Sequence, residues 1–168
     1  MTSRPSISRP SITRPGRLGW RPAAVVAMLI LASFALPGRS LAAEAGMVKT
    51  AVGGAWVERA GVRTPARVGD TVREADVIVT GADGSVGITF ADNSRMSIGP
   101  NSVLVIDRFV FDSTTHGGAF ETSLGKGTLN AVSGNLTRQS PDAMKVKTPT
   151  AVLGVRGTEF FVRAGTTE

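Results

Sequence analysis

Apolar and polar side chains alternate along many short segments of the chain. Val86, Ile88 and Phe90 are each two residues apart, and Met96 and Ile98 repeat the pattern in the next segment. A period of two is typical of strands that bury one face of a sheet, and the glycines that separate the segments are typical of turns. The pattern therefore predicts an all-β fold of many short strands, arranged as a sandwich, a jelly roll or a solenoid-like stack.

Two dipeptides indicate turns between these segments. Asp83-Gly84 separates residues 76–80 from residues 85–90 and predicts a β-hairpin between the flanking strands. Asp92-Asn93 predicts a second tight turn, because these residue types tolerate left-handed backbone. Residues 136–143 are mostly polar and predict a surface loop.

An apolar segment, residues 23–36, follows an Arg- and Pro-rich start and ends at Pro37-Gly38. As a helix it would be roughly 21 Å long, which is shorter than the ~30 Å hydrocarbon core of a bilayer. Small residues follow, including Ala42 and Ala43. This order predicts a secretory signal peptide over residues 1–42, cleaved between Ala42 and Ala43, and a single β domain over residues 43–168. The alternatives are an uncleaved membrane anchor and a buried core helix.

The formal net charge of +6 comes from the first 42 residues, which contain Arg but no Asp or Glu. The rest of the chain carries acids and bases in equal number, so general nucleic-acid binding lacks an electrostatic basis. The chain has no Cys, which excludes disulfides, thiolate catalysis and Cys-based zinc sites. Its single histidine, His116, lies in a polar segment, and most Asp residues stand at expected turns. We therefore expect no enzymatic activity, no cofactor and no metal.

Three segments, residues 68–81, 86–102 and 146–160, together resemble the FecR domain family, the periplasmic part of ferric-citrate-type transmembrane regulators. The resemblance extends over residues 46–163 and implies a part in relaying an outer-membrane signal inward. The signature residues, expected to be structural or to contact a partner, are Gly69, Asp70, Asp76, Thr80, Asp92, Thr148, Pro149, Arg156, Gly157 and Thr158.

Elementary chemistry gives some of these residues a role. Gly69 can adopt backbone angles that other residues avoid, and Asp70 and Asp76 can accept amide hydrogen bonds within their turns. Arg156 stands in a small and apolar context. It is either buried against a carboxylate such as Asp70 or Asp92, because buried charges need partners, or exposed as a contact for another protein.

Residues 1–22 are too few and too rich in Pro for the cytoplasmic anti-sigma segment that members of this family usually carry. We therefore expect a free-standing, non-enzymatic protein-interaction or sensing module, periplasmic or secreted in a Gram-negative bacterium and linked to cell-envelope signalling. Its partner would be a protein such as an envelope receptor or regulator, bound by strand addition at a sheet edge. We expect no nucleic-acid partner, and membrane contact only with an uncleaved leader.

Three alternatives to this function stay open. One is a structural or surface-associated module of the cell envelope. Another is a signal-anchored membrane regulator, which requires that the leader is not cleaved. The third is a hydrolase that uses carboxylates or His116.

Overall fold

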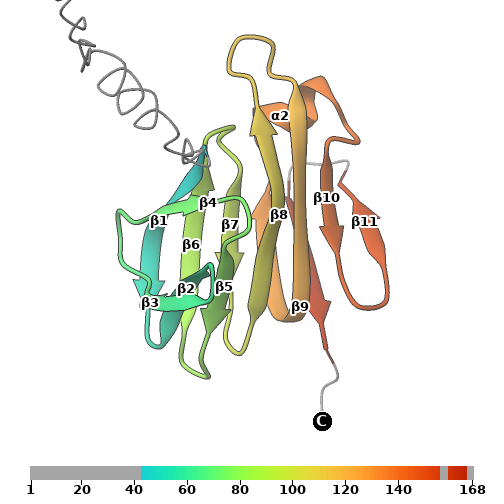
Figure 1. The fold of residues 1–168 in the computed structure, drawn as a ribbon. Helices are drawn as coiled ribbons and strands as arrows, with labels where there is room; N and C mark the ends of the chain where they lie inside the picture. Colours follow the sequence, from blue (N-terminus) through green and yellow to red (C-terminus); the bar gives the residue numbers. More distant parts are fainter. Residues whose placement is uncertain (1–42, 156–158, 166–168) are drawn as a thin grey trace, which may run out of the picture. The chain divides into compact units, whose positions relative to one another are not determined.

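The computed structural model describes residues 43–155 and 159–165, and nearly every element in them is a strand (Figure 1). The strands are β1 (Glu44–Val52), β2 (Ala55–Arg59), β3 (Val62–Pro65), β4 (Thr71–Arg73), β5 (Val77–Thr80), β6 (Ser85–Phe90), β7 (Arg95–Ile98), β8 (Val103–Phe111), β9 (Gly118–Val132), β10 (Met144–Lys147), β11 (Val152–Gly154) and β12 (Glu159–Ala164). Between β9 and β10 lies the short helix α2 (Asn135–Gln139). The prediction of an all-β fold is confirmed.

Several sequence-based predictions concern residues outside the described ranges. They are the signal peptide over residues 1–42, the cleavage position after Ala42, and the roles of Arg156, Gly157 and Thr158. Ala43 is the first described residue and is exposed. Within the described residues, no helix has the length and apolar character needed to cross a membrane.

The strands of the described residues form one twelve-stranded sheet that curls into two layers, with β9 in both. The first part of β9 pairs with β8 and, in parallel, with β10, whereas its second part pairs with β7 and β12. Layer A therefore runs β12-β9-β7-β6-β1-β4, and layer B runs β3-β2-β5-β8-β9-β10-β11. The partners change at Gly127, where a φ of +97° and the adjacent Ser102 side chain leave no room for a Cβ.

The inner faces of the two layers pack against each other. Phe90 of layer A lies 4.5 Å from Phe120 and 5.5 Å from Phe109 of layer B, measured between ring centroids. The alternating apolar residues predicted to share one face are buried in this core, including Val86, Ile88, Phe90, Met96 and Ile98. Of the three arrangements that the alternation allows, the structure therefore shows the sandwich.

The predicted hairpin at Asp83-Gly84 is wrong. β5 pairs with β2 and β8 in layer B, whereas β6 pairs with β1 and β7 in layer A. The turn carries the chain from one layer to the other, and it is held by the β1–β2 turn. There the Gly81 N–H donates to the Gly54 carbonyl (2.7 Å), and the Gly54 N–H donates to an Asp83 carboxylate oxygen (3.2 Å). A hairpin and a crossover both need a sharp turn, so turn residues alone do not distinguish them.

Two further turn predictions have opposite outcomes. Asp92-Asn93 joins β6 and β7 in a hairpin with Asn93 at a φ of 65°, as predicted. Residues 136–143 do not form a plain surface loop, because α2 occupies the first part of this stretch and buries Leu136 completely. A helix of five residues is too short to show a 3.6-residue period, so the sequence pattern gives no signal for it.

Candidate functional site

An ion pair between a partly exposed Arg59 and a buried Asp76 joins the two layers where the chain passes from β4 to β5. The Asp76 carboxylate is completely buried, and its two oxygens accept hydrogen bonds from Nε and Nη2 of Arg59, both at 2.7 Å. The Arg73 N–H donates to the same carboxylate at 2.8 Å. Arg59 Nη2 also donates to the Thr71 carbonyl of β4 at 3.0 Å. Arg59 of layer B therefore holds both the connection between the layers and the edge of layer A.

This geometry explains the electrostatics of the pair. A guanidinium and a carboxylate that meet through two parallel hydrogen bonds stabilise each other's charged form. The hydrogen bonds to Asp76 raise the pKa of Arg59 above its ordinary value. Because the carboxylate is buried, the Arg59 guanidinium is the opposite charge that compensates for its removal from water. We call Arg59 and Asp76 the interlayer clamp.

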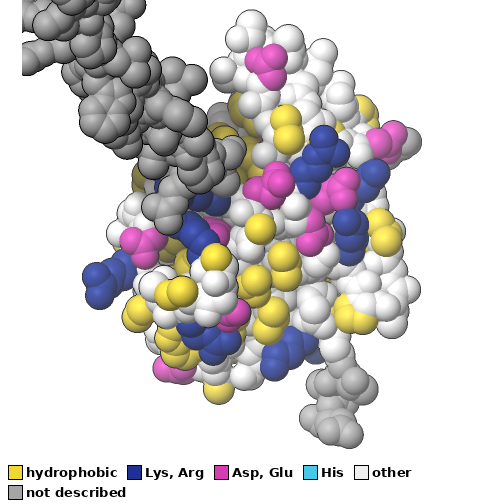
Figure 2. Space-filling model, viewed as in Figure 1, with side chains coloured by type: hydrophobic (Ala, Val, Ile, Leu, Met, Phe, Trp, Pro, Cys, Tyr) yellow, Lys and Arg dark blue, Asp and Glu magenta, His cyan; other side chains and the backbone are white. Residues whose placement is uncertain are grey.

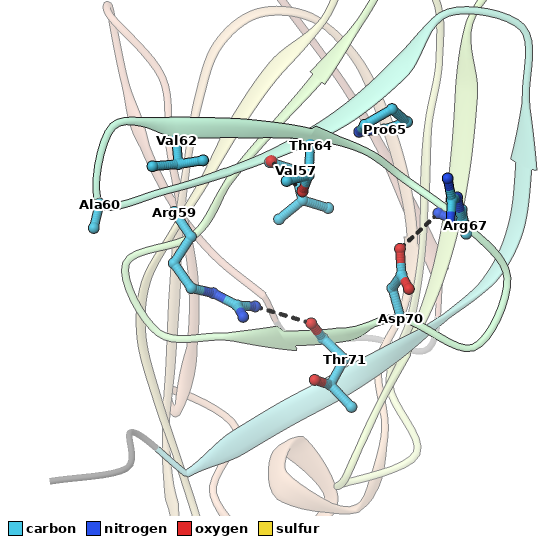
Figure 3. A pocket seen from close by; sticks show the side chains of 9 residues that line it. All are labelled: Val57, Arg59, Ala60, Val62, Thr64, Pro65, Arg67, Asp70 and Thr71. Atoms are coloured by element: carbon cyan, nitrogen blue, oxygen red, sulfur yellow. Dashed lines mark hydrogen bonds between the residues drawn. The ribbon is translucent and has the colours of Figure 1, made fainter. Parts of the chain in front are cut away.

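An open cavity of about 660 Å³ lies beside the clamp (Figure 3). It exists because β3 and β4 are the last strands of their layers on this side and do not pair with each other. We call it the β3–β4 opening, and its lining residues are Val57, Arg59, Ala60, Val62, Thr64, Pro65, Arg67, Asp70 and Thr71. Val62 of β3 lines the opening, and its side chain is 64% exposed to solvent.

The loop that forms one wall of the opening contains two of the signature residues. Asp70 accepts the Arg67 N–H at 2.8 Å, which is the turn contact expected for this residue type. Gly69 has a φ of +95° and donates its N–H to the Val48 carbonyl at 2.9 Å. These contacts fix the loop against β1 of layer A.

The lining combines apolar side chains, two guanidinium groups, one carboxylate and two Thr hydroxyls. The opening also exposes the outer edge of β3, all four residues of which are exposed. The opening therefore combines an apolar and charged lining with an exposed strand edge.

Thr80 and Asp92 lie elsewhere and hold turns. Thr80 Oγ1 donates to the Gly99 carbonyl at 2.7 Å and accepts the Ser102 N–H at 2.9 Å. Asp92 is completely buried and accepts from the Ser94 N–H (3.0 Å) and hydroxyl (2.6 Å). Neither residue lines the opening, so the fold separates them from Asp70 and Asp76.

Thr148 and Pro149 belong to the turn between β10 and β11. The Thr148 N–H donates to the Ala151 carbonyl at 2.8 Å, and the Thr148 hydroxyl accepts the Ala151 N–H at 3.1 Å. Pro149 is exposed in this turn. Both residues therefore lie in layer B, away from the lining of the β3–β4 opening.

Sequence reasoning missed Arg59. The sequence singled out Arg156 instead, either buried against Asp70 or Asp92 or exposed as a partner contact, and Arg156 lies outside the described residues. A signal was present, because Ala55, Val57 and Arg59 alternate along β2 and so share one face. A charged residue on a face that is otherwise buried needs a partner inside the fold.

The two layers also end side by side at β11 and β12. A smaller cavity of about 320 Å³ lies there, and we call it the β11–β12 opening. Five of its seven lining residues have apolar side chains; the lining consists of Leu153, Gly154, Val155, Glu159, Phe160, Phe161 and Val162. Phe161 is 64% exposed, and Val152 and Leu153 of β11 are exposed as well.

Charged side chains gather on one part of the outer face of layer B, over β8–β10 (Figure 2). Lys147 Nζ lies 2.7 Å from Glu121 Oε2 and 3.7 Å from Asp107 Oδ2. Figure 2 shows acidic and basic side chains interleaved over β8–β10. The hydrogen bond from Lys147 lowers the pKa of Glu121, and Glu121 in turn raises the pKa of Lys147. These ion pairs are accessible to solvent, so they belong to a hydrated surface and each contributes little to stability.

The fold and its buried turn contacts define a β-sandwich module with two open sides. Comparison with protein families identifies it further: the model of the FecR protein family matches residues 76–168, more than half of the chain. The protein belongs to the FecR family. No curated protein and no solved structure matches it. The match starts at Asp76, so β1–β4 and all nine residues that line the β3–β4 opening precede it.

Proposed function

We propose that this protein is a non-enzymatic protein-binding module of the bacterial envelope, acting in the periplasm or outside the cell. Membership of the FecR family is compatible with a part in signalling or regulation. The single observation that carries the proposal is the β3–β4 opening, a cavity of about 660 Å³ beside an exposed strand edge. We propose that it takes an extended segment of a partner protein.

The proposed mode of binding is strand addition. An edge strand has unpaired backbone donors and acceptors that a partner strand can use, while side-chain pockets give specificity. Here β3 supplies the edge, and Val62 and Thr64 line the opening next to it. The clamp keeps the opening at a fixed width, because Arg59 spans from β2 to the Thr71 carbonyl of β4. A partner strand with alternating apolar and polar residues fits this lining.

Site-specific photo-crosslinking in living cells tests the proposal. A benzophenone amino acid replaces Val62 in the opening or, as a control, Val110 of β8, which is also exposed. We expect one covalent adduct with an envelope protein from position 62 and none from position 110. The additional substitution Thr64→Asp should reduce the adduct. The same adduct from both positions, or none from position 62, would contradict the proposal.

The location of the protein needs a separate measurement, the intact mass of the protein recovered from fractionated cells. We expect a soluble envelope species that begins at Ala43, which must act through another protein. A full-length species in the inner-membrane pellet would instead favour a signal-anchored regulator. In that case residues 23–36 serve as an anchor.

A further inference from the structure

β12 is the longest of the strands that form a free sheet edge in the described residues. It has six residues, and it pairs with β9 from Glu159↔Val132 to Ala164↔Gly127 without any shift in register. The other free edges are shorter: β3 has four residues and ends in Pro65, and β4 and β11 have three each. Short strands and edge prolines prevent unwanted pairing. β12 lacks both devices, so its edge can accept another strand.

The outward-facing side chains of β12 form a symmetrical pattern. Glu159, Phe161 and Arg163 are exposed, and they alternate with more buried neighbours. Glu159 accepts one hydrogen bond, from Asn130 at 3.3 Å. Arg163 contacts no carboxylate in the part of the chain that the structure describes. An acid and a base therefore stand at equal distances on either side of a central exposed Phe.

We infer that a second copy of this chain occupies the edge, with the two β12 strands antiparallel about a twofold axis at Phe161. In this register Glu159 of each copy lies opposite Arg163 of the other, and the two Phe161 rings face each other. Opposite charges and aromatic pairs directly across two strands stabilise a sheet. A twofold interface needs a self-complementary surface, which this pattern provides.

The neighbouring registers do not place Glu159 opposite Arg163. Sliding the strands so that the pairing centres on Phe160 places Glu159 opposite Phe161, and centring it on Val162 places Phe161 opposite Arg163. In both cases the acid and the base no longer meet. The inferred register also pairs Phe160 with Val162 on the inner face, beside the β11–β12 opening that these residues line. The dimer would therefore cover apolar surface at that opening.

Disulfide trapping tests the register, since the chain has no Cys of its own. Opposite residues in an antiparallel pair have Cα atoms about 4.5–5.5 Å apart, within the range that a disulfide bridges. Protein recovered from cells expressing the full chain should form a linked dimer when it carries Phe161→Cys. Glu159→Cys and Arg163→Cys should each link poorly alone but should link when mixed. Val110→Cys of β8 is the exposed control and should form no disulfide-linked dimer.

Charge exchange tests the inference without a covalent bond. We expect Glu159→Arg to weaken the dimer roughly tenfold in sedimentation equilibrium, because it replaces two ion pairs with two repulsions. Adding Arg163→Glu to the same chain should restore the affinity. All of these side chains are exposed, so the variants should keep the unfolding transition of the monomer.

Three results would overturn the inference. They are a protein that sediments as a monomer at every concentration, linkage of Val110→Cys as efficient as that of Phe161→Cys, and a double charge variant that binds no better than Glu159→Arg. None of these results would contradict the proposed partner site, because that site lies at β3 and is tested separately through position 62. A dimer that forms normally with no adduct from position 62 would contradict only the proposed function.

Discussion

The two open sides of this sandwich are built differently. At the β3–β4 opening, a buried carboxylate and a partly exposed guanidinium tie the last strands of the layers together. At the β11–β12 opening, five of the seven lining residues have apolar side chains, and Phe161 among them is 64% exposed. A polar clamp satisfies its own groups within the fold, whereas exposed apolar residues gain free energy only when another surface covers them. The comparison therefore assigns the clamp to internal stability, which leaves the exposed β3 edge beside it for the proposed partner, and assigns the exposed Phe161 of β12 to association.

Removing the clamp should have the largest effect on stability. Asp76→Ala deletes the acceptor of two Arg59 hydrogen bonds and of the Arg73 N–H. We expect the free energy of unfolding to fall by about 3 kcal/mol, because two charge-assisted hydrogen bonds are lost and the Arg73 N–H is left without its acceptor. Equilibrium urea unfolding followed by circular dichroism measures this change.

Asp70→Ala is the matched control for this experiment. Asp70 lines the opening beside the clamp, but among the described residues its carboxylate accepts a hydrogen bond only from the Arg67 N–H. We expect a loss of about 1 kcal/mol or less. Equal losses from the two substitutions would mean that the turn contacts, and not the clamp, hold this side of the sandwich.

On the β12 side, adjacent residues should differ in their effect. Val162 is part of the core, so Val162→Ala should cost about 1–2 kcal/mol through lost burial and a cavity. Phe161→Ala should change the free energy of unfolding by no more than about 0.5 kcal/mol in dilute protein. It should also abolish any dependence of apparent stability on protein concentration. A large loss from Phe161→Ala in dilute protein would mean that this ring is structural.

The sequence allowed the strands to be predicted better than their pairing. Alternation at Val86, Ile88 and Phe90 reports which face of a strand is buried, and that face depends on the strand alone. Pairing depends on the whole chain, so Asp83-Gly84 gave no warning that β5 and β6 belong to different layers. The candidate site was harder for the same reason. Asp76 could be recognised by its turn, but its partner Arg59 lies 17 residues away in the sequence.

The weakest effect should come from an ion pair with the same 2.7 Å contact as the clamp but on the hydrated outer face, Lys147 with Glu121. Because this pair lowers the pKa of Glu121, its stabilisation is present above the ordinary pKa of a Glu side chain and is lost as the pH falls through the lowered value. Lys147→Met should therefore reduce the melting temperature slightly near neutral pH, and the difference from the unaltered protein should disappear in acid. Added salt should diminish this difference too.

Thermal melts of both proteins from about pH 7 to about pH 3 measure the difference in melting temperature. The prediction is contradicted if the melting-temperature difference persists in acid or is as large as that of Asp76→Ala. Burial would then not explain why one ion pair stabilises the protein more than the other.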